Sequence, residues 1–192
     1  MTIRLIVSLT LASLLFTLSA CVTTPEVAEK VSDQPVGDTL EPIFRGALAK
    51  MKSEKFADAV TGFKSIIASD PSLTSPRFNL ALALHQENRD EAAMAAVNEL
   101  LGVEPLHLPG QNLKATLLLM DGQVEASKAV LERMLSVSDF PAAHYNLGVL
   151  CDVYLSDLSC ARYHLSTYQR LRQDDDHRVT AWLAELENRD KE

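Results

Sequence analysis

A spacing of about 34 residues runs through most of this 192-residue chain. Small residues recur at this spacing at Ala59, Ala93, Ser127 and Ala161. A second small column upstream holds Ala47, Ala81 and Ala115, and then Gly148, which comes one position short of a full period. Apolar residues follow the first column by four positions, at Phe63, Val97, Leu131 and Leu165. A period of this length indicates a stack of small units that share one core, because no single unit can bury its own apolar face. With 7 Gly and 6% aromatic residues, the chain suits helical units better than strands and turns.

These columns resemble the tetratricopeptide repeat, in which two antiparallel helices make a unit of about 34 residues. The match is most legible near the C-terminus, where the pattern residues are His144, Leu147, Gly148, Cys151, Ala161 and Leu165. The initial Trp of the family pattern is absent from every repeat. The resemblance implies an all-α, right-handed solenoid over residues 40–192, with repeats at about 40–73, 74–107, 108–140 and 141–173. Small residues would mark each helix crossing, Ala47 against Ala59 and Gly148 against Ala161.

An amphipathic segment follows the last repeat. Val179, Trp182, Leu183 and Leu186 are spaced as on one face of a helix. We expect a capping helix at about 175–189 that covers the open end of the array. The preceding Asp174, Asp175 and Asp176 suit the N-terminus of that helix. The alternative, a metal site made by these residues with His177, would require consecutive residues to converge on one ion.

Residues 1–20 have the pattern of an export signal. Arg4 precedes an apolar run of about 14 residues, which is shorter than the roughly 20 needed to span a bilayer. Leu18-Ser19-Ala20-Cys21 resembles the lipobox of bacterial lipoproteins, which implies that residues 1–20 are removed and Cys21 is acylated. Val22 is not an inner-membrane retention residue, so the resemblance implies the inner leaflet of the outer membrane, facing the periplasm. Residues 21–39 would be the lipidated cysteine and a flexible tether. The alternative is an ordinary cleaved signal that leaves Cys21 as a free thiol.

Cys151 and Cys160 remain as a pair in an oxidising compartment, and either a disulfide or two buried thiols fits their positions.

The five histidines stand singly in the sequence, and neither a nucleophile elbow nor a phosphate-binding loop is present. We therefore expect no enzyme activity and no cofactor. The formal net charge of −8 argues against a nucleic-acid partner.

Tetratricopeptide arrays bind protein segments along the surface formed by their first helices, and the resemblance implies the same function here. The residues whose register places them on that surface are Phe44, Leu48, Phe78, Asn79, Leu82, Asn112, Thr116, Tyr145, Asn146 and Val149. Aromatic rings would supply contact area, and amides would bond the backbone of an extended ligand. Together with the lipobox, this groove resembles that of the repeat lipoproteins that help type IV or tight-adherence pilus systems assemble their secretin. An adaptor of a peptidoglycan hydrolase, an accessory of a TonB-type complex, a self-associating structural protein and a metal-dependent envelope enzyme are the alternatives.

Overall fold

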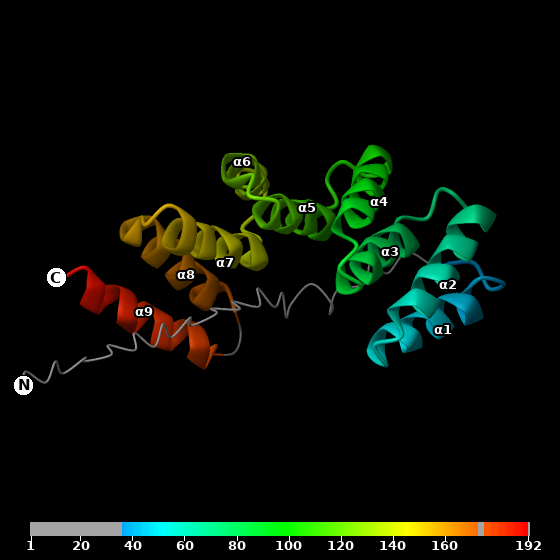
Figure 1. Cartoon of the computed structure of the whole chain (residues 1–192), viewed down its shortest axis with the longest axis horizontal. Helices are drawn as coiled ribbons and strands as arrows, with labels where there is room; N and C mark the ends of the chain where they lie inside the picture. The colour runs from blue at the N-terminus through cyan, green and yellow to red at the C-terminus, as the bar shows by residue number, and fades with distance from the viewer. Residues whose placement is uncertain (1–35, 173–174, 192) are drawn as a thin grey trace, which may run out of the picture.

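The computed structural model describes residues 36–172 and 175–191, and these residues form an all-α structure. The helices are α1 (Glu41–Lys52), α2 (Phe56–Ser69), α3 (Thr74–Gln86), α4 (Asp90–Val103), α5 (Leu108–Met120), α6 (Val124–Leu135), α7 (Pro141–Val149), the π-helix η1 (Leu150–Tyr154), α8 (Leu158–Leu171) and α9 (His177–Arg189). Successive helices pair as hairpins, and each hairpin packs on the next along a row that ends at α9 (Figure 1). The predicted fold class, four helix–turn–helix repeats with a C-terminal helix, is confirmed.

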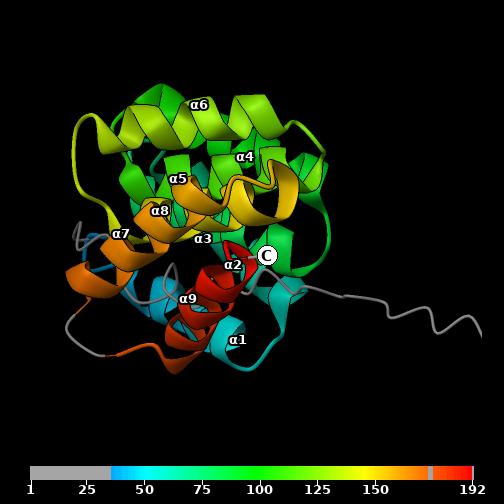
Figure 2. The same ribbon diagram turned by 90° about the vertical axis from the view of Figure 1, so that its left-hand side faces the viewer.

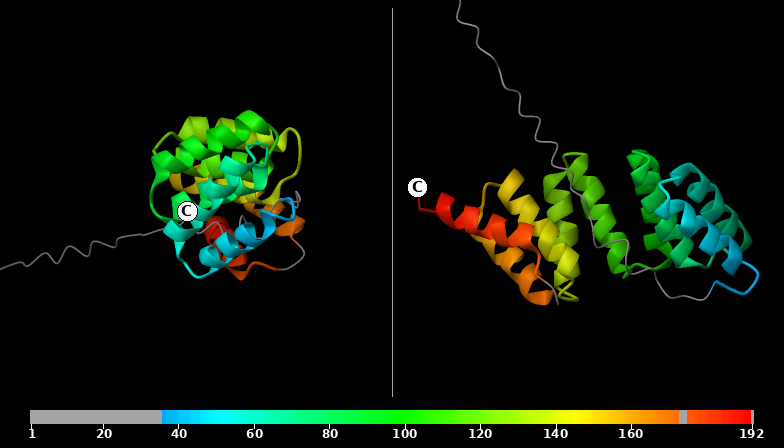
Figure 3. Two further views of the ribbon diagram at one scale, coloured as in Figure 1. Left: turned by 90° about the vertical axis from the view of Figure 1, so that its right-hand side faces the viewer. Right: turned by 90° about the horizontal axis from the view of Figure 1, so that it is seen from below.

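Apolar side chains pack between neighbouring hairpins, in three clusters that follow one another along the row. Seen along the row, the hairpins overlap (Figure 2), and seen from below they stand side by side (Figure 3). The apolar column of the sequence lies inside these clusters, since Phe63, Val97, Leu131 and Leu165 are all fully buried. Phe63 also meets the ring of Phe44 edge-on, with centroids 5.9 Å apart. Burial between neighbouring hairpins is therefore what stabilises the array.

A column of turn residues, not singled out from the sequence, separates the two helices of each repeat. Glu54, Asn88, Gly122 and Ser156 recur at the repeat period, and each has a positive φ, between 54° and 76°. A left-handed residue ends one helix and lets the chain reverse into the next. Asn88 and Gly122 are residue types that favour this conformation, whereas Glu54 and Ser156 give no such signal.

In the first helix of each repeat, a fixed number of residues is expected between the small residue and the turn residue that follows. The fourth repeat has one residue more in this interval than the third. Gly148 lies eight positions before Ser156, whereas Ala115 lies seven positions before Gly122. The extra residue falls in η1, where the backbone N–H of Leu155 donates to the carbonyl of Leu150. A π-helical turn accommodates one added residue in a helix without breaking it.

Two helix crossings have close contacts that the columns of small residues did not predict. A Cβ on Gly148 would lie 2.6 Å from Cγ and Cδ2 of Leu165, so this glycine lies directly against Leu165. Ala47 is closely approached by Gly62, whose added Cβ would lie 2.9 Å from the Ala47 Cβ. The crossing point is set by how the helices tilt, which the spacing of small residues alone does not fix.

The packed structure begins earlier than the expected boundary at residue 40. Val36 is 4% exposed and belongs to the apolar cluster of the first two repeats. The backbone N–H of Leu40 donates to the carbonyl of Gly37 in the turn that leads into α1. The turn before α1 therefore packs with the first repeat instead of belonging to the tether.

Candidate protein-binding surface

The residues expected to line the groove all lie on the first helices of the repeats. These are Phe44 and Leu48 on α1, Phe78, Asn79 and Leu82 on α3, Asn112 and Thr116 on α5, and Tyr145, Asn146 and Val149 on α7. Leu48 and Tyr145 are half-buried, and the other eight are buried. Their role in binding a partner stays a prediction.

Buried amides join the first helices of the third and fourth repeats. Asn146 Nδ2 donates to Asn112 Oδ1 at 2.8 Å and lies 3.4 Å from Thr116 Oγ1. In the second repeat Asn79 instead donates to the backbone carbonyl of Ser75 at 2.9 Å. Since Asn112 and Asn146 stand one period apart, this hydrogen bond fixes how the third and fourth repeats sit against each other.

Asn146→Ala should lower the free energy of unfolding by about 1 to 3 kcal/mol, because the buried Oδ1 of Asn112 loses its donor. Urea unfolding followed by circular dichroism measures this loss. Asn188→Ala, at an exposed position near the end of α9, is the matched control and should change stability by less than about 0.5 kcal/mol. Equal losses of stability in the two variants would show that the hydrogen bond between Asn146 and Asn112 does not couple the repeats.

Aromatic rings form the C-terminal end of the predicted surface. The ring of Tyr145 lies 5.2 Å from that of Tyr168 and 6.5 Å from that of Trp182, between centroids. Burial raises the pKa of the Tyr145 hydroxyl. Tyr145 therefore packs against both α8 and α9, and the capping helix borders the predicted groove.

A histidine completes the junction of the second and third repeats. His107 lies with its ring centroid 5.0 Å from that of Phe78, and its Nδ1 accepts a hydrogen bond from the backbone N–H of Gly110 at 2.9 Å. Burial lowers the pKa of His107, which keeps the ring neutral and its Nδ1 able to accept. His107 is thus the N-cap of α5, a role not expected from the sequence.

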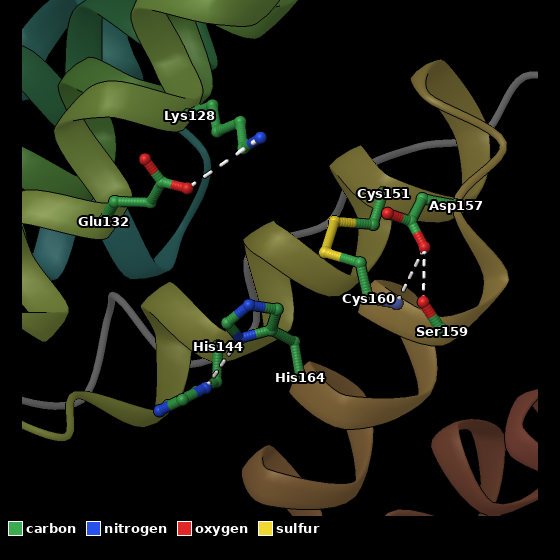
Figure 4. The surroundings of a disulfide bond; sticks show 8 residues. All are labelled: Lys128, Glu132, His144, Cys151, Asp157, Ser159, Cys160 and His164. Atoms are coloured by element: carbon green, nitrogen blue, oxygen red, sulfur yellow. Dashed lines mark hydrogen bonds and ion pairs between the residues drawn. A yellow bond between two sulfur atoms is a disulfide. The ribbon is translucent and has the colours of Figure 1, made fainter.

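Two histidines that stand apart in the sequence meet across the fourth hairpin. Their Nδ1 atoms, in His144 on α7 and His164 on α8, are 2.9 Å apart (Figure 4). Burial lowers the pKa of both rings, and the neighbouring His144 helps to bring that of His164 to about 4. A hydrogen bond between these two Nδ1 atoms requires that one of them carries a proton and the other does not. The sequence positions of these two histidines, 20 residues apart, do not indicate this contact, which arises because α7 and α8 pair.

The His144–His164 pair predicts a loss of stability in acid. Because the pKa of His164 is about 4 in the folded chain and near 6.5 in the unfolded chain, the unfolded chain binds more protons between these values. The free energy of unfolding should therefore fall as the pH drops from about 6.5 towards 4. Urea unfolding at several pH values should show a smaller acid loss in His164→Gln than in the unchanged chain. Equal losses would contradict this assignment, since carboxylates contribute alike to both proteins.

The residues of the possible metal site serve other purposes. The Asp176 side chain accepts a hydrogen bond from the backbone N–H of Arg178 and so caps α9. The Asp175 carboxylate accepts a hydrogen bond from the Gln169 side chain, and the His177 side chain is 92% exposed. Asp174 lies outside the described residues. Within 36–172 and 175–191, no group of three metal-ligating side chains comes together.

Cys151 and Cys160 form a disulfide that joins η1 to α8, with their Cα atoms 5.8 Å apart (Figure 4). Asp157 caps α8 beside it, accepting from the backbone N–H of Cys160 at 2.9 Å. Cys21 and the export signal lie outside the described residues. Among the helices of the described part, none combines the length and apolarity needed to cross a bilayer.

A shallow apolar pocket lies away from the predicted groove, between α2, α3 and α4. Its volume is about 380 Å³, and Ile67, Leu80, Leu84 and Ala96 contribute to its lining. Lys64 and Glu99, both exposed, also line it. Sequence spacing did not single out this site, because the pocket forms only where two hairpins meet.

Comparison with known proteins supports the fold. No family model matches the chain, and no curated protein matches it significantly. Among solved structures, PilF of Pseudomonas aeruginosa is similar with a TM-score of 0.73 and 15% identity, over 82% of this chain and 72% of PilF. MamA of Desulfovibrio magneticus RS-1 has a TM-score of 0.67 and 17% identity, over 82% of this chain and 88% of that one. The tetratricopeptide-repeat protein TTC0263 of Thermus thermophilus has a TM-score of 0.65 and 16% identity, over 77% and 80% of the two chains. The fold is therefore that of a tetratricopeptide-repeat array.

Proposed function

We propose that this chain is a scaffold without enzymatic activity, anchored by a lipid on Cys21 and facing the periplasm, which binds a protein partner along its first helices. The observation that carries the proposal is the repeat array itself, whose first helices carry the ten residues of the predicted surface and leave Leu48 and Tyr145 half-buried at that surface. The lipobox residues 18–21 support the anchor, and the short apolar run before them supports export.

The partner that we propose is a component of a pilus secretin. The combination of a lipobox with a tetratricopeptide array supports this machine, because it resembles the repeat lipoproteins that help pilus systems assemble their secretin. A peptidoglycan-hydrolase adaptor and a TonB-type accessory are the alternatives. Removing the chain from cells should then reduce assembled secretin multimers in the outer membrane, while secretin monomer is still made. Normal multimers in such cells would overturn the secretin proposal.

The anchor is tested by a single substitution. Cys21→Ser should abolish acylation, detected as the loss of an acyl mass on the N-terminal peptide, and should move the protein out of the outer-membrane fraction. The double variant Cys151→Ser/Cys160→Ser is the matched control and should remain acylated and membrane-bound. Outer-membrane fractionation of Cys21→Ser that equals that of the unchanged chain would overturn the anchor.

A further inference from the structure

The fourth repeat differs from the other three at one place. Within the described residues, the π-helix η1 and the Cys151–Cys160 disulfide both occur only here. Cys151 is fully buried in η1, and Cys160 is half-buried in the first turn of α8. The backbone N–H of Asp157 also donates to the carbonyl of Cys151 at 2.8 Å. The disulfide and this bond together hold the end of η1 against the start of α8.

The residue that follows Cys151 is a buried carboxylate directed at the capping helix. Asp152 is 9% exposed, and its Oδ2 accepts a hydrogen bond from Trp182 Nε1 at 2.7 Å. Its Oδ1 pairs with Arg189 Nη1 at 2.8 Å. Asp152 lies four positions before the turn residue Ser156. The equivalent residues are the buried Leu84 and Leu118 in the second and third repeats, and the half-buried Lys50 in the first. A charged residue in a core column is costly unless it has partners, and both partners of Asp152 lie on α9.

The other contacts that keep α9 in place lie at its two ends or on a narrow apolar face. Its buried residues are Val179 and Leu186, and the rest of its length is exposed or half-buried. Gln169 of α8 donates to Thr180 Oγ1 at 3.0 Å near the start of α9. Arg162 of α8 forms an ion pair at 2.9 Å with Asp190, just past the end of α9. Asp152 is therefore a principal polar attachment of α9, and its position depends on the turn that the disulfide closes.

We propose that the Cys151–Cys160 disulfide is a redox latch that holds α9 on the end of the array through Asp152. In the latched state η1 presents Asp152 to Trp182 and Arg189. When the latch opens, η1 loses its tie to α8, Asp152 moves away, and α9 is released. Release uncovers the face formed by Tyr145 and Tyr168, which borders the predicted groove.

The opening step is thiol–disulfide exchange with a dithiol reductant. One thiolate of the reductant attacks Sγ of Cys160, forms a new S–S bond, and sends the electron pair of the old bond to Sγ of Cys151, which takes up a proton. The second thiolate then attacks the reductant's own sulfur in this mixed disulfide. Cys160 leaves as a thiolate and is protonated. The dithiol becomes a cyclic disulfide, and the protein gains two electrons and two protons.

Hydrogen exchange of the full-length protein in detergent micelles, before and after dithiothreitol, tests the latch. Reduction should raise exchange in α9 by about tenfold or more, with little change in α1 to α4. Trp182 is the only tryptophan of the chain, so acrylamide should quench its fluorescence more strongly after reduction. Cys151→Ser/Cys160→Ser should show the same state without reductant. Oxidised Asp152→Ala, which removes the acceptors for Trp182 and Arg189, should also release α9. Asp121→Ala, in the exposed turn of the third repeat, is the matched control and should not.

Three results would overturn the latch. Unchanged exchange in α9 after reduction would show that the disulfide holds only the hairpin. Equal increases in every helix would show that it stabilises the whole array and controls no particular element. A docked α9 in oxidised Asp152→Ala would remove Asp152 from the mechanism.

Discussion

Phe63→Ala is expected to lower the free energy of unfolding by about 3 to 5 kcal/mol, because it opens a cavity in the fully buried stack between the first two repeats. The edge-on contact with Phe44 is lost as well. Urea unfolding followed by circular dichroism gives the value.

Phe56→Ala provides the matched control for this prediction. Phe56 begins the same helix and is only half-buried, so its truncation should cost far less than that of Phe63. Similar losses in the two variants would contradict the claim that the apolar column carries the core.

Leu165→Ala should cost about 2 to 5 kcal/mol on its own, since Leu165 is fully buried against Gly148. Gly148→Ala alone should also destabilise, by about 1 to 3 kcal/mol, because its new methyl group meets Leu165. In the double variant the methyl group fills part of the cavity. The combined loss should therefore be smaller than the sum of the two separate losses.

Gly46→Ala tests whether the effect at Gly148 comes from contact rather than from helix propensity. Gly46 lies inside α1, and a Cβ there meets no atom within 4 Å. This substitution should stabilise the chain by about 0.5 to 1 kcal/mol. Additive losses for Gly148 and Leu165, or destabilisation by Gly46→Ala, would contradict the packing described here.

The periodic part of the fold could be predicted from the sequence because packing constrains it directly. Phe63 and its equivalents must be large and buried, and Ala47 and Gly148 must be small, so these columns are visible in the residues themselves. The partners across each crossing were not predictable, because helix tilt decides that Gly148 meets Leu165. The left-handed turn residues were missed since Glu54 and Ser156 do not favour a positive φ.

The fourth repeat shows why local irregularities are harder to predict. The shortened spacing at Gly148 was visible, but only the structure shows that η1 absorbs the compensating extra residue. The pairing of His144 with His164 likewise depends on two helices crossing, as does the attachment of Asp152 to α9. The placement of the candidate groove residues on the first helices was predictable, whereas the burial of eight of them depends on how neighbouring hairpins tilt together.

The proposed scaffold function depends on whether the first helices contact a partner in cells. Photoreactive residues at Leu48 and Tyr145, the two half-buried positions of the predicted surface, test this contact most directly. Thr61 on α2 and Tyr163 on α8 are exposed positions on second helices and serve as controls. We predict that Leu48 and Tyr145 each crosslink to one envelope protein, identified by mass spectrometry as a secretin component, and that the controls do not. Crosslinks from the controls alone, or only to a second copy of this chain, would contradict the account.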